Sequence, residues 1–169
     1  MVSGDLLGRI EFTVEAMLKP WRHDPECFVT RIKGKIMSYI DDGEEVQIGD
    51  IDLEVYHVSD ALDAGPDLAS LFDAQALDEL WARLFVEDEF DPNLGIDTLT
   101  NDVLYINAVN IDPTCKDASA RIRAVRTAMA VFCPYGLAAA HYSALTDSEG
   151  RHLGFKRLSR TKFVFGVPR

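Results

Sequence analysis

The residues best placed for chemistry lie in a short polar loop, residues 114–117, that joins a predicted strand to a predicted helix. The preceding run, residues 103–111, is apolar and rich in β-branched residues, which is typical of a central strand. Apolar residues recur at helical spacing after the loop and predict a helix over residues 119–132. The first N–H groups of a helix lack partners and carry the positive end of its dipole, so this unit suits a phosphate group.

Three other places carry reactive or charged side chains. His141 has an ordinary pKa near neutrality and suits acid–base work, although a hydrogen-bonded structural histidine fits the same position. Cys115 precedes the helix, where a thiol becomes more acidic, but no histidine lies near it in sequence. The acidic run of residues 87–91 is a candidate cation or amine site, with a solvated loop as the alternative. Arg123 and Arg126 lie on the polar face of the predicted helix.

The N-terminal half predicts a three-stranded antiparallel meander. Residues 9–17 alternate between apolar and polar side chains, as in a half-buried strand. Residues 27–40 predict a second strand with Gly34 at a bulge, and Asp-Gly at residues 42–43 predicts a hairpin turn. Residues 51–56 alternate again and predict the third strand. A helical region then begins near Pro66, with an apolar stripe as far as Phe85.

The C-terminal part predicts a strand, a helical turn and one or two final strands. The first of these strands covers residues 137–143, and the helical turn covers residues 147–153. Gly154 follows the turn as a residue that ends a helix, and residues 155–167 complete the chain as strand.

The composition bounds the class of protein. A length of 169 residues with 47% hydrophobic and 27% charged residues predicts a single globular domain. No apolar run reaches the roughly 20 residues that span a bilayer, and no secretory signal is visible, so no membrane association is expected. Three cysteines without C-x-x-C spacing support neither a disulfide framework nor a zinc site, and a cytoplasmic location is the simplest expectation.

The net charge of −11 is unevenly distributed along the chain. Residues 1–112 hold 7 Lys and Arg against 25 Asp and Glu, whereas residues 113–169 hold 10 against 3. The acidic balance argues against nucleic acid as a partner. The basic C-terminal third suits a compact anionic ligand, or it forms a solvated surface that pairs with acidic neighbours.

The closing string HLGFKRLSRTKFVF resembles the end of the fold of the GNAT superfamily of N-acetyltransferases, in which a short helix ends in Leu-Gly-Phe and runs into a basic, aromatic strand. The resemblance covers about residues 102–165. It implies an α/β fold with a mixed, mostly antiparallel sheet flanked by helices. Residues 1–169 would form one domain, with a divergent N-terminal half, 1–101, and an acyl-CoA-binding half, 102–169.

The resemblance also implies where acyl-CoA would bind. Members bind it where their fourth and fifth strands diverge, here residues 103–111 and 137–143. Backbone groups of the fourth strand pair with the pantetheine arm, and the following loop holds the pyrophosphate. The implied cofactor-binding residues are Val109, Asn110, Ile111, Lys116, Ala118, Ser119, Ala120 and Arg121.

The chain departs from the family pattern at three places. The pyrophosphate loop contains no glycine, although its small residues keep close approach open, and Asp117 would repel a phosphate unless it turns outward to cap the helix. Gly150 stands where many members carry a tyrosine that protonates the departing thiolate, which leaves Tyr142 and Ser148 as the nearest hydroxyls. Family members usually insert two helices between their first two strands, whereas here the helical region follows three strands.

The resemblance implies transfer of an acetyl or other acyl group from acyl-CoA to an amine by direct attack. A carboxylate is the expected general base, and Glu87, Glu89 and Asp102 are candidates because they lie next to the predicted cleft. The acidic N-terminal half suggests a cationic small-molecule or protein amine as acceptor, and the open sheet edges leave a homodimer as an alternative to a monomer. A second hypothesis is a non-catalytic CoA-binding or protein-interaction module. A third is that the acidic face mimics nucleic acid.

Overall fold

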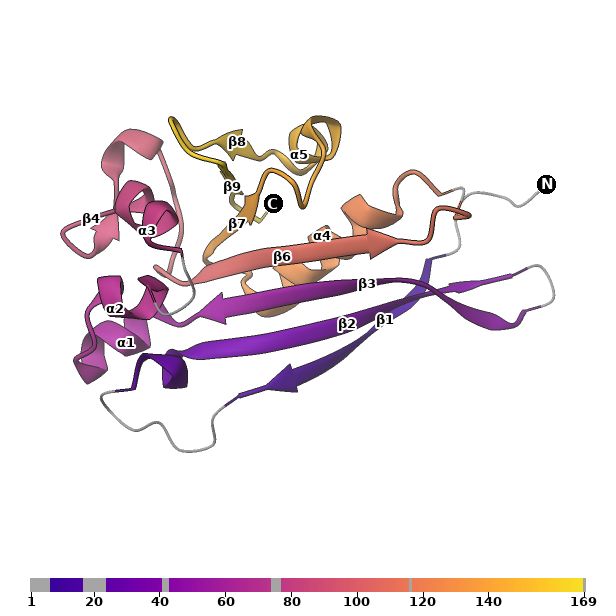
Figure 1. The fold of residues 1–169 in the computed structure, drawn as a ribbon, viewed down its shortest axis with the longest axis horizontal. Helices are drawn as coiled ribbons and strands as arrows, with labels where there is room; N and C mark the ends of the chain where they lie inside the picture. Colours follow the sequence, from indigo (N-terminus) through magenta and orange to yellow (C-terminus); the bar gives the residue numbers. More distant parts are fainter. Residues whose placement is uncertain (1–6, 17–23, 41–42, 74–76, 116, 169) are drawn as a thin grey trace.

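The computed structural model describes residues 7–16, 24–40, 43–73, 77–115 and 117–168. Its centre is a seven-stranded sheet with the strand order β1-β2-β3-β6-β7-β9-β8 (Figure 1). Strands β6 and β7 run parallel, and every other neighbouring pair described in this sheet is antiparallel. The mixed, mostly antiparallel sheet flanked by helices confirms the fold class predicted from the sequence.

The elements have the following bounds. The strands of the main sheet are β1 (Leu7–Glu15), β2 (Val29–Tyr39), β3 (Glu45–Tyr56), β6 (Val103–Ile111), β7 (Leu137–His141), β8 (Lys156–Arg157) and β9 (Phe163–Gly166). A separate hairpin contains β4 (Phe85–Val86) and β5 (Glu89–Phe90). The helices are α1 (Val58–Ala64), α2 (Leu68–Asp73), α3 (Asp78–Leu84), α4 (Ala120–Phe132) and α5 (Asp147–Leu153), with 3₁₀ turns η1 (Pro25–Phe28) and η2 (Pro92–Leu94).

The N-terminal meander forms as the sequence predicts, although β3 begins at Glu45, six residues before its predicted start. Strands β1, β2 and β3 pair in order, and the described residues between β1 and β2 form only η1. The prediction of a bulge at Gly34 is wrong, because Gly34 pairs regularly with Phe12 and Ile51 and the irregularity lies between Ile36 and Met37. Glycine is needed at position 34 for space, since a Cβ there would lie 2.6 Å from the Ile51 Cγ2 atom.

The helical region begins earlier than the sequence predicts. Helix α1 starts directly after β3, and Gly65 ends it in the left-handed conformation, with a φ of 116°. Gly65, directly before the predicted start of the helical region near Pro66, therefore closes its first helix. By contrast, β6 and α5 have the predicted bounds, and α4 begins one residue after its predicted start.

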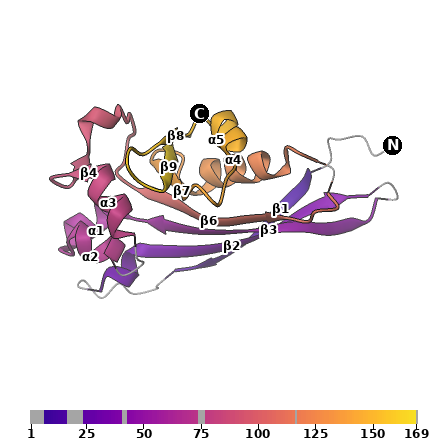
Figure 2. The ribbon, with the colours of Figure 1, turned by 45° about the horizontal axis from the view of Figure 1, so that its top comes forward.

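Two hydrophobic cores lie on opposite faces of the sheet. Helices α1, α2 and α3 cover one end of one face, with Tyr56, Phe72 and Leu80 in this α1-side core. Helices α4 and α5 cover the other face, with Leu53 and Leu104 in this α4-side core (Figure 2). Among the described residues, no helix combines the length and apolar character that crossing a bilayer would require.

Candidate functional site

Strands β6 and β7 diverge after a short parallel contact. They pair only from Val103 with Leu137 to Ile106 with Ala140. Strand β6 continues to Ile111, and along this stretch its only strand partner in the described chain is β3. The chain after β7 stays beside β9, because the N–H of Tyr142 donates to the carbonyl of Lys162 at 2.9 Å and extends the β7–β9 ladder by one residue. We call the gap between the two strands beyond Ile106 the fork.

A β-bulge lies at the base of the fork. On β3, the consecutive residues Asp52 and Leu53 pair with Ala108 and Ile106, so Asn107 is the extra residue of β6. A bulge bends its strand and re-aims local side chains and N–H groups. Asn107 is exposed and lines a depression on the face of the sheet opposite α4.

Glu54 is a buried carboxylate beside this bulge. It lies on β3 opposite Tyr105, and its exposed fraction is 9%, which makes it the one charged residue classed as buried in the described chain. The hydroxyl of Tyr56 donates to Glu54 Oε2 at 2.8 Å, and the Nε atom of Arg31 lies 3.7 Å from Glu54 Oε1. A buried carboxylate held by a hydroxyl and a guanidinium is a candidate general base.

The two tyrosines next to Glu54 stay protonated at neutral pH. Burial raises the pKa of Tyr56, and the charge of the Glu54 carboxylate raises it further. Burial also raises the pKa of Tyr105, with Glu54 again adding to the effect. Tyr56 therefore donates to Glu54 as a neutral phenol, and Tyr105 stays a neutral neighbour of the carboxylate, not a competing anion.

The predicted pyrophosphate loop holds a carboxylate of its own. Asp117 Oδ1 accepts hydrogen bonds from the Ser119 N–H at 2.9 Å and from the Ser119 hydroxyl at 2.7 Å. Its other oxygen accepts a hydrogen bond from the guanidinium of Arg123. Burial raises the pKa of Asp117, but the hydrogen bonds from Ser119 and the charge of Arg123 outweigh it, and the net pKa is lowered. Asp117 thus turns inward onto the start of α4.

Other predicted residues of this loop have different surroundings. Arg121 spans from α4 to α5, since its Nη2 donates to the Ala144 carbonyl at 2.7 Å and its Nε lies 2.9 Å from Glu149 Oε1. Ala118 is exposed, whereas Ala120 is fully buried. Lys116 lies outside the described residues. The bridge made by Arg121 joins the two helices that flank the fork on its α4 side.

The predicted pantetheine-binding residues lie along the unpaired stretch of β6. Val109 is buried in the α4-side core, and Ile111 packs against that core. Asn110 faces the other way, and its side-chain amide donates to Asp50 Oδ1 at 2.9 Å. The structure therefore places these three residues on the part of β6 that extends beyond its pairing with β7.

The three predicted catalytic residues do not meet at one point. Tyr142 is about half exposed and lines a 370 Å³ cavity together with Gly150 of α5. Ser148 is exposed, and its carbonyl accepts from His152. Glu89 lies in the β4–β5 hairpin, where it accepts from Asn101 at 3.0 Å, at the end of the molecule away from the fork (Figure 1).

The other two predicted carboxylates also lie far from the fork. Glu87 occupies the turn of the same hairpin, with a φ of 51°. Asp102 precedes β6, five residues before the bulge, which corresponds to roughly 16 Å of extended strand. Glu54 is the carboxylate that the sequence reasoning missed. The signal for it was Tyr56, an aromatic residue two positions later on the same face, which indicates that this end of the strand is covered.

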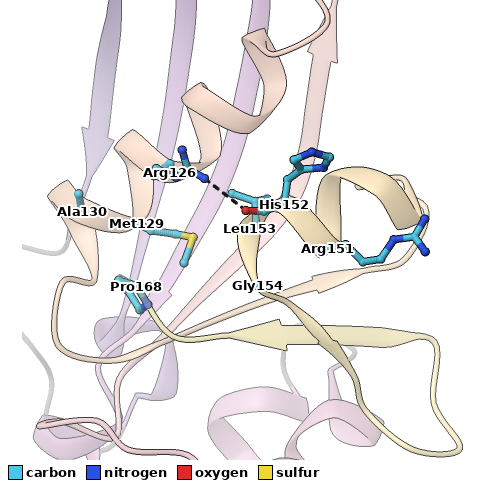
Figure 3. Close-up of a pocket in the computed structure, with 8 residues that line it drawn as sticks. All are labelled: Arg126, Met129, Ala130, Arg151, His152, Leu153, Gly154 and Pro168. Atoms are coloured by element: carbon cyan, nitrogen blue, oxygen red, sulfur yellow. Dashed lines mark hydrogen bonds between the residues drawn. The ribbon is translucent and has the colours of Figure 1, made fainter.

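A small cavity between α4 and α5 is the remaining basic feature near the fork (Figure 3). Its volume is 150 Å³, and Arg126 lines it while donating to the His152 carbonyl at 3.3 Å. The side chain of Arg151 extends away from it in Figure 3. Ligand cavities generally exceed roughly 300 Å³, so this cavity does not suit a cofactor.

Comparisons of the chain with protein-family models, curated proteins and solved structures found no match. Within the described residues, no group of three or more His, Cys, Asp or Glu side chains is arranged to hold a metal ion.

Proposed function

We propose that this protein is an acyl-CoA-dependent N-acyltransferase that transfers an acetyl or other acyl group to an amine. The observation that carries the proposal is the fork, where a bulged β6 continues beyond the end of its parallel partner with Glu54 buried beside the bulge. The family that the sequence resembles binds acyl-CoA between two such strands.

The residues of the fork have complementary roles in this proposal. Alternate backbone N–H groups of β6 beyond Ile106 point away from β3, where they can pair with the pantetheine arm and polarise the thioester carbonyl. Glu54 lies on the opposite face, where the amine would approach, and accepts the proton that the amine loses on attack. The acyl-CoA and the amine acceptor would thus be held on the two sides of β6. This fixed arrangement replaces a bimolecular encounter in solution with an oriented one.

Glu54 therefore replaces Glu89 as the proposed general base. Tyr142 is the proposed proton donor to the departing thiolate, because it shares its cavity with Gly150, where the resembled family often carries a tyrosine. Ser148 is a weaker candidate for this role, since it is exposed outside that cavity.

Asp117 favours a second candidate function, a CoA-binding or protein-interaction module without catalysis. Its carboxylate uses the Ser119 N–H and the Arg123 guanidinium, which are groups that a pyrophosphate would otherwise use. Gly150 supports the same alternative, because it supplies no proton donor.

Two measurements separate the acyltransferase from the non-catalytic module. They are calorimetric titration with acetyl-CoA and, after it, measurement of thiol release with a panel of amines. Binding with thiol release supports the acyltransferase, and binding without release from any amine supports the module. No binding would exclude the acyltransferase and the CoA-binding module. The Ser119→Glu variant locates the site, because a second carboxylate at the start of α4 abolishes binding only if the pyrophosphate lies there.

A further inference from the structure

A charged groove of 720 Å³ lies on the sheet face opposite α4. Strands β1, β2, β3 and β6 supply its floor, and Asn107 and Glu54 lie among its lining residues. Ile51 and Leu53 point to the α4-side core, so the residues that alternate with them face the groove. The groove thus leads to the carboxylate proposed as general base, and it is the face from which an amine would reach the fork.

The floor carries a row of bases beside a row of acids. Strand β2 contributes Arg31, Lys33 and Lys35 to the groove, and β3 contributes acids at the residues opposite them. The cross-strand pairs are Arg31 with Glu54, Lys33 with Asp52, and Lys35 with Asp50. Side chains directly opposite on one face lie close together, so positive and negative charges alternate across the floor.

Only some of these charges have partners. Arg31 pairs with Glu26 at 2.6 Å and approaches Glu54, and Asp50 accepts from Asn110. Lys33 and Lys35 make no hydrogen bond or ion pair with any residue that the structure describes. The groove therefore presents two ammonium groups without a direct ion pair among the described residues, and Lys33 is the nearer of them to Glu54, because its cross-strand partner Asp52 lies two residues from Glu54.

We infer that the acceptor is a zwitterionic amine, an amino acid or short peptide, whose carboxylate pairs with Lys33 or Lys35 while its amine lies at Glu54. This inference rests on the proposed function. Lys33 and Glu54 are diagonal neighbours on paired strands, a separation of roughly 7–8 Å, and the long lysine side chain spans the difference. A polyamine has no anion that could pair with Lys33 or Lys35, so the lysines favour, among the amines that the acids of the groove attract, those that also carry an anion.

The reaction balances without another reactant. The unprotonated amine nitrogen attacks the thioester carbonyl carbon, forming the C–N bond, and the C–S bond breaks. Glu54 takes the proton that the nitrogen loses, and the thiolate leaves as the thiol after protonation. The products are an N-acyl amino acid or peptide, free CoA and one proton released from the ammonium form of the acceptor.

Matched acceptors test the inference. Thiol release from acetyl-CoA is measured with leucine, leucylglycine, 3-methylbutylamine and spermidine, of which 3-methylbutylamine is leucine without its carboxylate. We expect kcat/KM to be about tenfold higher for leucine or the dipeptide than for the two amines. Lys33→Gln should raise KM for the zwitterion about fivefold and leave 3-methylbutylamine unchanged. The control is Lys156→Gln, an exposed lysine on β8 outside the groove lining, which should change neither.

The outcomes separate this inference from the proposed function. Turnover that favours spermidine or 3-methylbutylamine keeps the acyltransferase and overturns the zwitterionic acceptor. If no amine releases thiol, the acyltransferase proposal is wrong. NMR titration of the same compounds into the protein then shows whether the groove binds a zwitterion. Leucine binding that Lys33→Gln weakens supports a zwitterion site, and equal or absent binding of leucine and 3-methylbutylamine overturns it.

Discussion

At the scale of single residues, Glu54 carries the proposed chemistry. Glu54→Gln keeps the shape of the side chain and the hydrogen bond from Tyr56, but it removes the proton acceptor. We expect kcat to fall about 100-fold or more, because a positioned general base contributes on the order of 10²–10⁴ in rate. The affinity for acetyl-CoA should stay the same, since Glu54 lies on the acceptor face. Steady-state kinetics and calorimetry check both parts.

The matched control for Glu54 is Glu79→Gln, an exposed carboxylate on α3. It removes the same charge far from the fork and should leave kcat unchanged. If the two variants lose activity equally, or if Glu54→Gln retains full kcat, Glu54 is not the base.

Replacing Asp117 should improve acetyl-CoA binding, whereas replacing Glu54 should lower kcat. Asp117→Asn keeps an acceptor for the Ser119 N–H but removes a negative charge beside the proposed pyrophosphate site. We expect it to tighten acetyl-CoA binding several-fold, by about 1 kcal/mol, because like charges no longer oppose each other and Arg123 is released. Calorimetry measures the change, and weaker binding by this variant would place the pyrophosphate elsewhere.

Replacing Asp102 by Asn should stabilise the fold, and the size of this gain should depend on pH. Burial raises its pKa, against the Ser59 N–H hydrogen bond and the charge of His57. A carboxyl whose folded pKa is raised loses stability as pH climbs from its unfolded value, near 4, through the folded value. Asp102→Asn should therefore raise the free energy of unfolding at pH 7, and this gain should vanish below about pH 4. Urea unfolding at both pH values measures it, and a gain of equal size at both would contradict the assignment.

At the scale of elements, α5 offers a gain-of-function test. A Cβ added at Gly150 would meet its nearest neighbour, the Phe155 Cβ, at 3.9 Å, which is an ordinary contact. Gly150→Tyr extends a hydroxyl into the 370 Å³ cavity beside Tyr142. We expect kcat to rise up to about tenfold, because a second proton donor then serves the departing thiolate. Gly150→Phe is the control, since it fills the same space without a hydroxyl.

The two Gly150 variants also separate chemistry from stability. Replacing a glycine inside a helix removes a cost of roughly 0.5–1 kcal/mol, so both variants gain helix stability where the ring fits. If kcat rises equally in Gly150→Tyr and Gly150→Phe, better packing is the cause. If kcat rises in neither, a side chain at this position of α5 does not assist protonation of the thiolate.

Secondary-structure elements were predicted best where the side-chain periodicity and the residues that end a helix or strand agree. Strand β6 and helix α5 have strong boundaries, Asp112-Pro113 after the strand and Gly154 after the helix, and their predicted bounds match. Helix α1 was missed because it follows β3 after a single residue and is only seven residues long. Gly34 was misread because glycine supplies space as well as flexibility, and only the packed Ile51 side chain shows which.

The candidate site at Glu54 was harder to predict, because it depends on which end of the sheet the helices cover. Asp52 and Glu54 follow the same alternation on β3, and the pattern alone makes both solvent-facing. Helices α1 and α2 cover Tyr56 and leave Asp52 open, so Glu54 falls at the boundary between core and groove. The inward turn of Asp117 depends in the same way on Arg123, six residues later, reaching back to it.

At the scale of the whole molecule, one sheet joins the acidic and basic parts of the chain. Strand β6 of the acidic part pairs with β3 from Gly49 to Tyr56 and, on its other edge, with β7 of the basic part. Successive residues of β6 alternate between the two cores, with Tyr105 in the α1-side core and Leu104 in the α4-side core. The two halves are therefore not separate folding units, and a change in one core should be felt in the other.

Leu104→Ala tests this coupling. Leu104 is fully buried in the α4-side core, and truncating it should cost about 3 kcal/mol, within the range of buried leucine truncations. Trp81 packs against the α1-side core, so in a Trp21→Phe background, which leaves Trp81 as the single tryptophan of the sequence, its fluorescence reports the opposite face of the sheet. In a cooperative fold, urea unfolding followed by fluorescence and by far-ultraviolet circular dichroism shifts to the same lower midpoint. Two separate midpoints would mean that the helices over Trp81 unfold independently of the fork, and the groove that leads to Glu54 would then not be held in place by the strands that form it.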